Sequence, residues 1–234
     1  MQIRDLPSPN FDARNAPVDI LLLHYTGMKT AEAAIDRLRD PAAQVSAHYV
    51  VDEDGTTLRL VPEEMRAWHA GTSYWRGARD INARSIGIEI VNPGHEFGYR
   101  PFPDAQIQAV LALAQDIVRR HGIAPSRVLG HSDVAPLRKE DPGELFDWRF
   151  LAANGVGTWA KPKPSQWSDA EFLLALGRYG YDLEGPAGTD PAQARRAAIT
   201  AFARHFRPAR LDPVPDPELK AVLNGLIDFI AAGA

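Results

Sequence analysis

The sequence predicts an α/β fold, in which helices flank a mixed β-sheet and a small all-α domain follows. Short apolar runs of strand length alternate with helix patterns in the first part of the chain. A long amphipathic helix pattern stands among them, and only helix patterns follow residue 162. We therefore expect one domain over residues 1–162 and a second over residues 163–234.

Five segments of the first domain have the composition of strands. Residues 18–25 (VDILLLHY) form a short β-prone run bounded by Pro17 and Gly27, too brief for a helix. Residues 47–52 and 57–61 flank the turn sequence EDG as in a hairpin. Residues 85–91 and 127–130 are the remaining two candidate strands.

The clearest helix pattern covers residues 104–121 (DAQIQAVLALAQDIVRRH). Apolar residues recur at helical spacing, Asp104 stands where an N-cap is expected, and Gly122 provides the stop. This helix is expected to cover one face of the sheet.

A stiff linker and three helix starts define the second domain. Around residues 151–167 two Lys-Pro pairs block helix formation. Ser168 and Glu171 then form a capping box before an apolar helix that should end near Gly180. Two later Asp-Pro pairs, at 190–191 and 216–217, each place a cap before a proline at the first helical position.

Composition excludes several classes of function. The 234 residues are 45% hydrophobic and 24% charged, as in ordinary globular proteins, and the net charge of −4 shows no nucleic-acid-binding footprint. The chain has no cysteine, so disulfides, thiolate nucleophiles and lipid attachment through cysteine are excluded. Any metal must be held by His, Asp or Glu.

The sequence also predicts where the protein acts. The first residues carry charge and proline where a signal peptide needs an unbroken apolar stretch, and the apolar run at residues 20–23 is too short to span a bilayer. We therefore expect a protein without a membrane anchor in the cytoplasm, with the periplasm as the alternative. A monomer is also expected.

Three polar residues stand out because each is placed where a strand ends: His24, His131 and Asp141. Two neutral imidazoles and one carboxylate suit a hydrolytic zinc site, which keeps one coordination position open. The long separation of the two histidines makes the pattern weak by itself, and satisfied structural histidines are the commoner explanation. Both interpretations therefore stand at this point.

Two other catalytic motifs are incomplete. Residues 130–134 (GHSDV) begin like the nucleophile elbow of a serine hydrolase around Ser132, but the final glycine is missing. Residues 95–99 (HEFGY) begin like a zincin motif at His95, but Tyr99 stands where the second histidine should be.

A set of longer motifs gives the chain a family resemblance. LLLHYTG, VSAHYVVDEDG, VPEEMRAWHAG, SIGIEIVN, GHSDVAPLRKEDPG and FDW occur in this order between residue 6 and about residue 160. Together they resemble the AmpD and AmiD amidases of the zinc amidase and peptidoglycan-recognition superfamily. The C-terminal ALGRYGYDLEG and AFARHFRP resemble the helical domain of AmiD, which is similar to peptidoglycan-binding modules.

The resemblance assigns roles to individual residues. It implies zinc ligation by His24, His131 and Asp141. It also implies proton transfer by Glu89 and oxyanion stabilisation by Lys139. Substrate binding is expected at Tyr25, Trp68 and His69, although aromatic residues are often core residues instead. Taken singly, Glu89 and Lys139 could be ordinary surface charges.

The implied activity is hydrolysis of the bond between N-acetylmuramic acid, in particular its 1,6-anhydro form, and L-Ala in muropeptides, in cell-wall recycling. The alternative is a peptidoglycan-recognition module that binds muropeptides without cutting them. The presence of all five metal-binding and catalytic residues favours the enzyme, since binding-only members of the superfamily typically lack part of the metal set.

Overall fold

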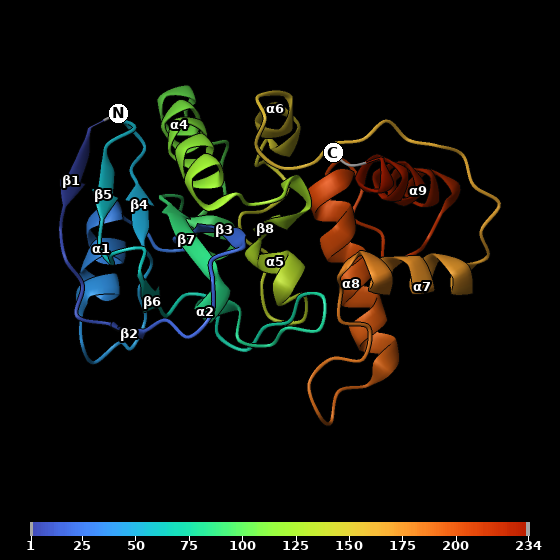
Figure 1. The fold of residues 1–234 in the computed structure, drawn as a ribbon, viewed down its shortest axis with the longest axis horizontal. Helices are drawn as coiled ribbons and strands as arrows, with labels where there is room; N and C mark the ends of the chain where they lie inside the picture. The colour runs from blue at the N-terminus through green and yellow to red at the C-terminus, as the bar shows by residue number, and fades with distance from the viewer. Residues whose placement is uncertain (1, 233–234) are drawn as a thin grey trace.

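The computed structural model describes residues 2–232, which form a central sheet with helices on both faces (Figure 1). The sheet has six strands in the order β1-β5-β4-β7-β3-β8, and a separate pair joins β2 and β6. The strands are β1 Ile3–Asp5, β2 Phe11–Ala13, β3 Ile20–Tyr25, β4 Tyr49–Val51, β5 Thr57–Arg59, β6 Met65–Ala67, β7 Ser85–Ile90 and β8 Val128–Gly130.

Among the described residues, helices occupy the connections and the C-terminal part. They are α1 Ala31–Arg39, α2 Ile81–Arg84, α3 Gly94–Phe97, α4 Asp104–His121, α5 His131–Val134, α6 Trp148–Ala153, α7 Asp169–Tyr179, α8 Pro191–Phe206 and α9 Pro217–Ala231. Strand β3 pairs in parallel with both β7 and β8, whereas β4 and β5 form the predicted antiparallel hairpin. The mixed α/β fold with a C-terminal helical part is thus confirmed.

The pleat of β3 divides its side chains between two apolar clusters. Leu21 and Leu23 pack with α4 on one face, while Ile20 and Leu22 pack with the C-terminal helices on the other. On β7, Ile86, Ile88 and Ile90 join the α4 cluster. The alternate residues of both strands, including His24 and Glu89, therefore face away from α4.

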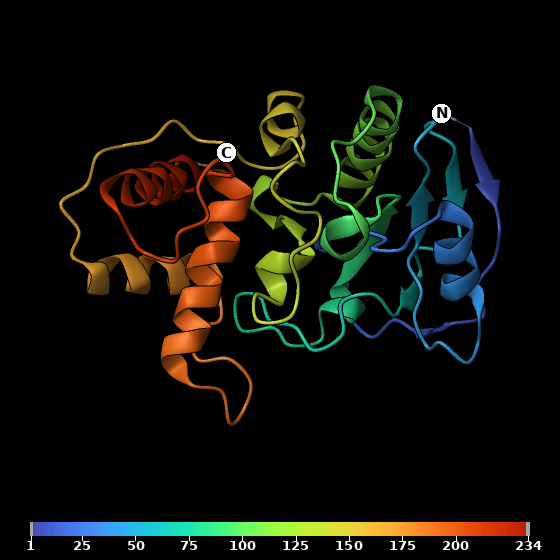
Figure 2. The same ribbon diagram turned by 180° about the vertical axis from the view of Figure 1, so that it is seen from behind.

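Two groups of helices cover this second face. Helix α1 packs over β4 and β5 through Leu38, which contacts the cluster of Val50, Leu58, Leu60 and Val91. Helices α7, α8 and α9 lie beyond α5, past the β8 edge, and share a cluster with the sheet (Figures 1 and 2). The middle of the face, between α1 and α8, is left for a site.

The helix ends follow the predicted chemistry in all but one case. Ser168 caps α7 in a capping box with Glu171, and Asp190 and Asp216 cap α8 and α9 ahead of their prolines. The prediction for Asp104 was wrong by one residue. Asp104 is the first helical residue, because Pro103 takes the cap position and accepts the first helical hydrogen bond from Ile107 N (3.0 Å).

The segment between α6 and α7 runs without helix or strand, as its Lys-Pro pairs predict. We retain the domain boundary near residue 162 as a proposal on this ground. In residues 2–232, no helix has the length and apolar character needed to cross a bilayer.

Glu63 ties the loop before β6 to α4 and β4. Its carboxylate accepts hydrogen bonds from Arg120, from His121 Nε2 (2.7 Å) and from the Tyr49 hydroxyl (2.7 Å). Burial alone would raise its pKa, but these partners outweigh it and hold the pKa at about 2, below the ordinary 4.5. The carboxylate therefore stabilises the fold above pH 4.5, and this contribution is lost as the pH falls toward 2.

We predict that Glu63→Gln lowers the free energy of unfolding at neutral pH by on the order of 2 kcal/mol, because the charge-assisted hydrogen bonds are lost. Urea unfolding across the acidic range should show a shallower pH dependence for the variant than for the wild type. Glu64→Gln, at the exposed neighbouring position, is the control. Equal behaviour of the two variants would contradict the assignment.

Candidate functional site

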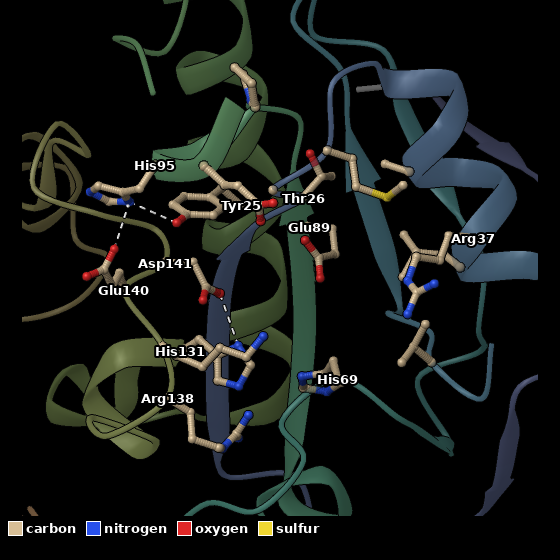
Figure 3. A pocket seen from close by; sticks show the side chains of 18 of the residues that line it. Tyr25, Thr26, Arg37, His69, Glu89, His95, His131, Arg138, Glu140 and Asp141 are labelled. Carbon is tan, nitrogen blue, oxygen red and sulfur yellow. Dashed lines mark hydrogen bonds and ion pairs between the residues drawn. The ribbon is translucent and has the colours of Figure 1, made fainter. Parts of the chain in front are cut away.

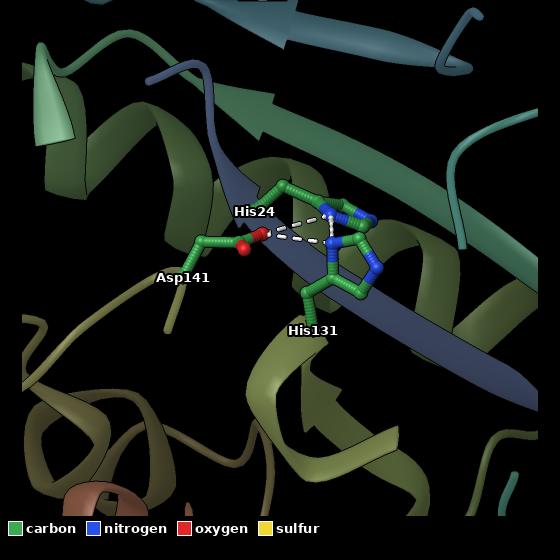
Figure 4. Close-up of side chains that lie close together, drawn as sticks. All are labelled: His24, His131 and Asp141. Atoms are coloured by element: carbon green, nitrogen blue, oxygen red, sulfur yellow. Dashed lines mark hydrogen bonds and ion pairs between the residues drawn. The ribbon is translucent and has the colours of Figure 1, made fainter. Parts of the chain in front are cut away.

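Three side chains converge at the carboxyl ends of β3 and β8 (Figure 4). His24 lies near the end of β3, His131 directly follows β8, and Asp141 comes from the loop after α5. His24 Nδ1 and His131 Nδ1 are 2.9 Å apart, and Asp141 Oδ2 lies 3.1 and 3.0 Å from them. All three residues are buried, and together they can hold a metal ion.

The backbone around these residues is closely fitted. A Cβ at Gly130 would lie 2.8 Å from Pro142 Cδ, so glycine allows the Asp141 loop to pass close to β8. The Ser132 amide donates to the Asp141 carbonyl (2.9 Å), which fastens that loop to the start of α5. His131 and Asp141 are therefore held as one unit.

The outer nitrogens of both histidines have partners of their own. His131 Nε2 lies 3.0 Å from the Ala70 carbonyl, an obligate acceptor, so Nε2 carries the proton and Nδ1 presents a lone pair. His24 Nε2 lies 3.0 Å from His69 Nδ1, and the same tautomer follows when His24 donates in this contact. Lone pairs of both imidazoles then face the Asp141 carboxylate, an arrangement suited to a cation.

The charge states agree with metal binding. Burial lowers the pKa of His24 to about 4, so the ring is neutral near neutral pH. Neutral imidazoles and an ionised carboxylate are the forms that bind a metal.

Glu89 lies beside this group on β7. It is the register partner of His24, so the two side chains share a face. Its Oε2 atom is buried and has no hydrogen-bond partner among the described residues. Burial, and then the charge of Asp141, raise the pKa of Glu89 well above its usual value. An unpartnered carboxyl oxygen next to the candidate metal site is available to a bound water or substrate group.

Glu89, His131 and Asp141 line a cleft of about 940 Å³ on the sheet face (Figure 3). Helix α1 contributes one wall through Ala34, Arg37 and Leu38, and helix α8 contributes another through Ala197, Thr200 and Arg204. Lys139 lines the same cleft, two residues before Asp141.

All three residues predicted to bind substrate line the same cleft: Tyr25, Trp68 and His69. The Tyr25 hydroxyl is hydrogen-bonded to His95 Nδ1 (2.9 Å), and burial raises its pKa to about 12. His69 has an additional contact, because its ring reaches His24 Nε2. A Cβ at Gly87 would lie 2.6 Å from His69 Nδ1, so this glycine makes room for the ring.

The two incomplete motifs form no catalytic arrangement. Ser132 is buried, and within residues 2–232 no hydrogen bond joins its hydroxyl to a histidine. His95 lies at the cleft wall, where it pairs with Glu140 (3.4 Å) and Glu144 (3.2 Å), outside the candidate metal group.

Sequence reasoning missed three residues of the cleft: Arg37, His95 and Arg204. No local pattern places them at a cleft, because α1, α3 and α8 meet there only in the folded chain. In the sequence, Arg37 and Arg204 resemble ordinary solvated charges on helices.

The fold and the site together define a mixed α/β protein with a candidate mononuclear metal centre in an open cleft, a layout suited to hydrolysis. The family model described as N-acetylmuramoyl-L-alanine amidase matches residues 14–144. The chain belongs to the N-acetylmuramoyl-L-alanine amidase family.

Two relatives of known name illustrate the range of the similarity. The N-acetylmuramoyl-L-alanine amidase AmiD of Escherichia coli is 38% identical, over 90% of this chain and 83% of its own. The 1,6-anhydro-N-acetylmuramyl-L-alanine amidase AmpD of Enterobacter cloacae is 36% identical, over 64% of this chain and 88% of its own. The predicted family resemblance is thereby confirmed.

Solved structures agree. Escherichia coli AmiD, in complex with the substrate anhydro-N-acetylmuramic acid-L-Ala-D-gamma-Glu-L-Lys, has a TM-score of 0.80 and 37% identity, with 93% of this chain and 92% of that chain covered. AmpDh3 of Pseudomonas aeruginosa has a TM-score of 0.80 and 32% identity, with coverages of 97% and 96%. Both alignments include the C-terminal helices.

We predict that His69→Phe weakens metal binding by about tenfold or more, because the ring volume remains but the acceptor for His24 Nε2 is lost. Zn²⁺ competition against a chromophoric chelator measures the effect. Tyr25→Phe, which changes a cleft residue without a contact to the three candidate ligands, should leave metal affinity unchanged. Unaltered affinity in His69→Phe would show that the His24 contact does not orient the ligand.

Proposed function

We propose that this protein is a zinc-dependent N-acetylmuramoyl-L-alanine amidase. The substrate is the lactyl-amide bond between N-acetylmuramic acid, including its 1,6-anhydro form, and the L-Ala of a muropeptide. The convergence of His24, His131 and Asp141 beside the unpartnered carboxyl of Glu89 is the observation on which the proposal rests. The names of the AmiD and AmpD relatives support the choice of substrate.

The three donor side chains fit zinc, because imidazole nitrogen and carboxylate oxygen are ordinary zinc ligands and the site faces a cleft. A zinc ion held there supplies Lewis-acid polarisation of the amide carbonyl and lowers the pKa of water.

The chain's own residues supply proton transfer and charge stabilisation. Glu89 accepts a proton from the attacking water and passes it to the departing nitrogen of L-Ala, so hydrolysis leaves a free acid and a free amine. The raised pKa of Glu89 suits this double role, because the carboxyl both takes up and returns the proton. Lys139 stabilises the negative charge that develops on the carbonyl oxygen.

Binding without hydrolysis is the weaker alternative. A recognition module needs the cleft but has no use for a carboxyl beside a complete set of metal ligands. Here Glu89, Lys139 and the three candidate ligands all line or adjoin one cleft.

We further propose that the enzyme acts as a monomer on soluble 1,6-anhydro-muropeptides in the cytoplasm, in peptidoglycan recycling. The printed names of the AmpD relatives support the choice of anhydro-muropeptides.

The purified protein is incubated with anhydro-muropeptides or with intact sacculi, and the products are identified by mass spectrometry. Free peptide should be released from the soluble anhydro-muropeptides and not from the sacculi. A chelator should abolish the release and added Zn²⁺ should restore it. Glu89→Gln should bind zinc but lose at least about a hundredfold in turnover, because the proton acceptor is gone. Ser132→Ala, the matched control for a serine hydrolase, should retain activity.

The outcomes of these digests separate the alternatives. Absence of cleavage by a zinc-loaded wild type would favour the recognition module, and loss of activity in Ser132→Ala alone would favour serine chemistry. Equal cleavage of sacculi would contradict the restriction to soluble fragments but leave the amidase chemistry in place.

Fractionation of native cells, followed by immunodetection, tests the place of action. The protein should accompany a cytoplasmic marker rather than a periplasmic one. Recovery with the periplasmic marker would overturn the recycling proposal.

A further inference from the structure

Two consecutive residues of α8, Arg204 and His205, hold residues that neighbour the candidate metal ligands. His205 contacts Asp133, two positions after His131, and Arg204 contacts Glu140 and Glu144, on either side of Asp141. Helix α8 thus meets both segments that place ligands at the carboxyl end of β8.

Asp133 is the firmer of these attachments. It is 1% exposed and receives three donors: the Tyr181 hydroxyl at 2.5 Å, His205 Nδ1 at 2.7 Å and the Gly130 amide at 2.7 Å. Two of these donors come from the C-terminal helical part, and the third precedes His131 in the chain. The carboxylate therefore fixes the first turn of α5 against both β8 and α8.

Stacking fixes the position of His205. Its ring lies 3.9 Å from that of Trp148, with an interplanar angle of 17°, and the residue is 4% exposed. A Cβ added at Gly130 would lie 3.2 Å from the Trp148 ring, so this ring also borders β8, which His131 directly follows. A packed ring that donates to a buried carboxylate is a rigid attachment.

Arg204 makes the second attachment. Its guanidinium lies 3.5 Å from Glu144 and 3.7 Å from Glu140, and its side chain is 9% exposed. The two carboxylates flank Asp141, and the Asp141 carbonyl accepts from the Ser132 amide on α5. The two attachments therefore act on one unit that includes both His131 and Asp141.

We propose that the C-terminal helical part positions two of the three metal ligands, His131 and Asp141, through Arg204 and His205 of α8 and through Tyr181, which lies between α7 and α8. The C-terminal helical part is then a support of the metal centre as well as a wall of the cleft. This inference rests on the proposed metal-dependent function, but it concerns the chain's own contacts and is tested by metal affinity rather than by turnover.

The test uses the full chain with two ring-preserving changes, Tyr181→Phe and His205→Phe. Together they remove both side-chain donors of Asp133 while keeping the aromatic packing. We expect the dissociation constant for Zn²⁺, measured by chelator competition, to rise by at least about tenfold in the double variant, because supporting contacts of ligands commonly have effects of this size. Arg204→Met, which leaves Asp133 untouched, should weaken Zn²⁺ binding independently.

A matched control separates positioning from general stabilisation. Arg76 also joins the two parts of the chain, since its Nε donates to the Tyr179 carbonyl (2.8 Å), but it contacts neither ligand segment. Arg76→Met should lower the unfolding temperature of the metal-free protein without changing Zn²⁺ affinity. Equal Zn²⁺ affinity of the wild type, the Phe double variant and Arg204→Met would overturn the proposal, whatever their stability.

Two further results keep the test decisive. If the double variant fails to fold, His205→Gln and His205→Phe replace it as single changes. Gln, which retains a donor, should keep affinity nearer to the wild type than Phe does, and equal values would count against positioning. A wild type that binds no Zn²⁺ would instead refute the proposed function itself.

Discussion

The parallel register of β3 with its two neighbours is the constraint on which the site depends. Pairing with β7 sets His24 opposite Glu89, and pairing with β8 sets Leu23 opposite Gly130, so His131 follows at the same edge. Because side chains alternate between faces, a slip of one residue would turn His24 into the apolar cluster under α4. The cost of burying the polar His24 ring in that apolar cluster opposes such a slip, so the core that stabilises the sheet also fixes the chemistry at its edge.

The site requires polar groups to be buried, and the buried histidine nitrogens have specific hydrogen-bond partners. The Ala70 carbonyl accepts a hydrogen bond from His131 Nε2, and His69 contacts His24 Nε2. Gly87 leaves the space that the His69 ring needs. The unpartnered oxygen of Glu89 differs from this pattern. A buried acceptor without a partner costs on the order of 1–3 kcal/mol, a cost that a functional site accepts when a reactant completes the contact.

The sequence predicts the parts of this structure that depend on local chemistry. Apolar runs located β3, β7 and β8, and helix caps located α7, α8 and α9, because strand composition and capping act within a few residues. Strands β1, β2 and β6 were not predicted, since three residues carry little periodicity and these strands exist through pairing with distant partners. His205 was assigned no role for a related reason. Its partner Asp133 is 72 residues away, and no pattern on α8 indicates that contact.

The C-terminal helices link stability to the geometry of the site. Ile20 and Leu22 of β3 belong to the same apolar cluster as Phe172, Phe202 and Leu223 of these helices. Helix α8 approaches closely because its inner positions are small, namely Ala194, Ala198 and Ala201, all at most 1% exposed. That close approach places the next turn, with Arg204 and His205, within reach of the loops that bear the ligands. The apolar packing that holds α8 against the first part of the chain therefore also places the supporting side chains of the metal site.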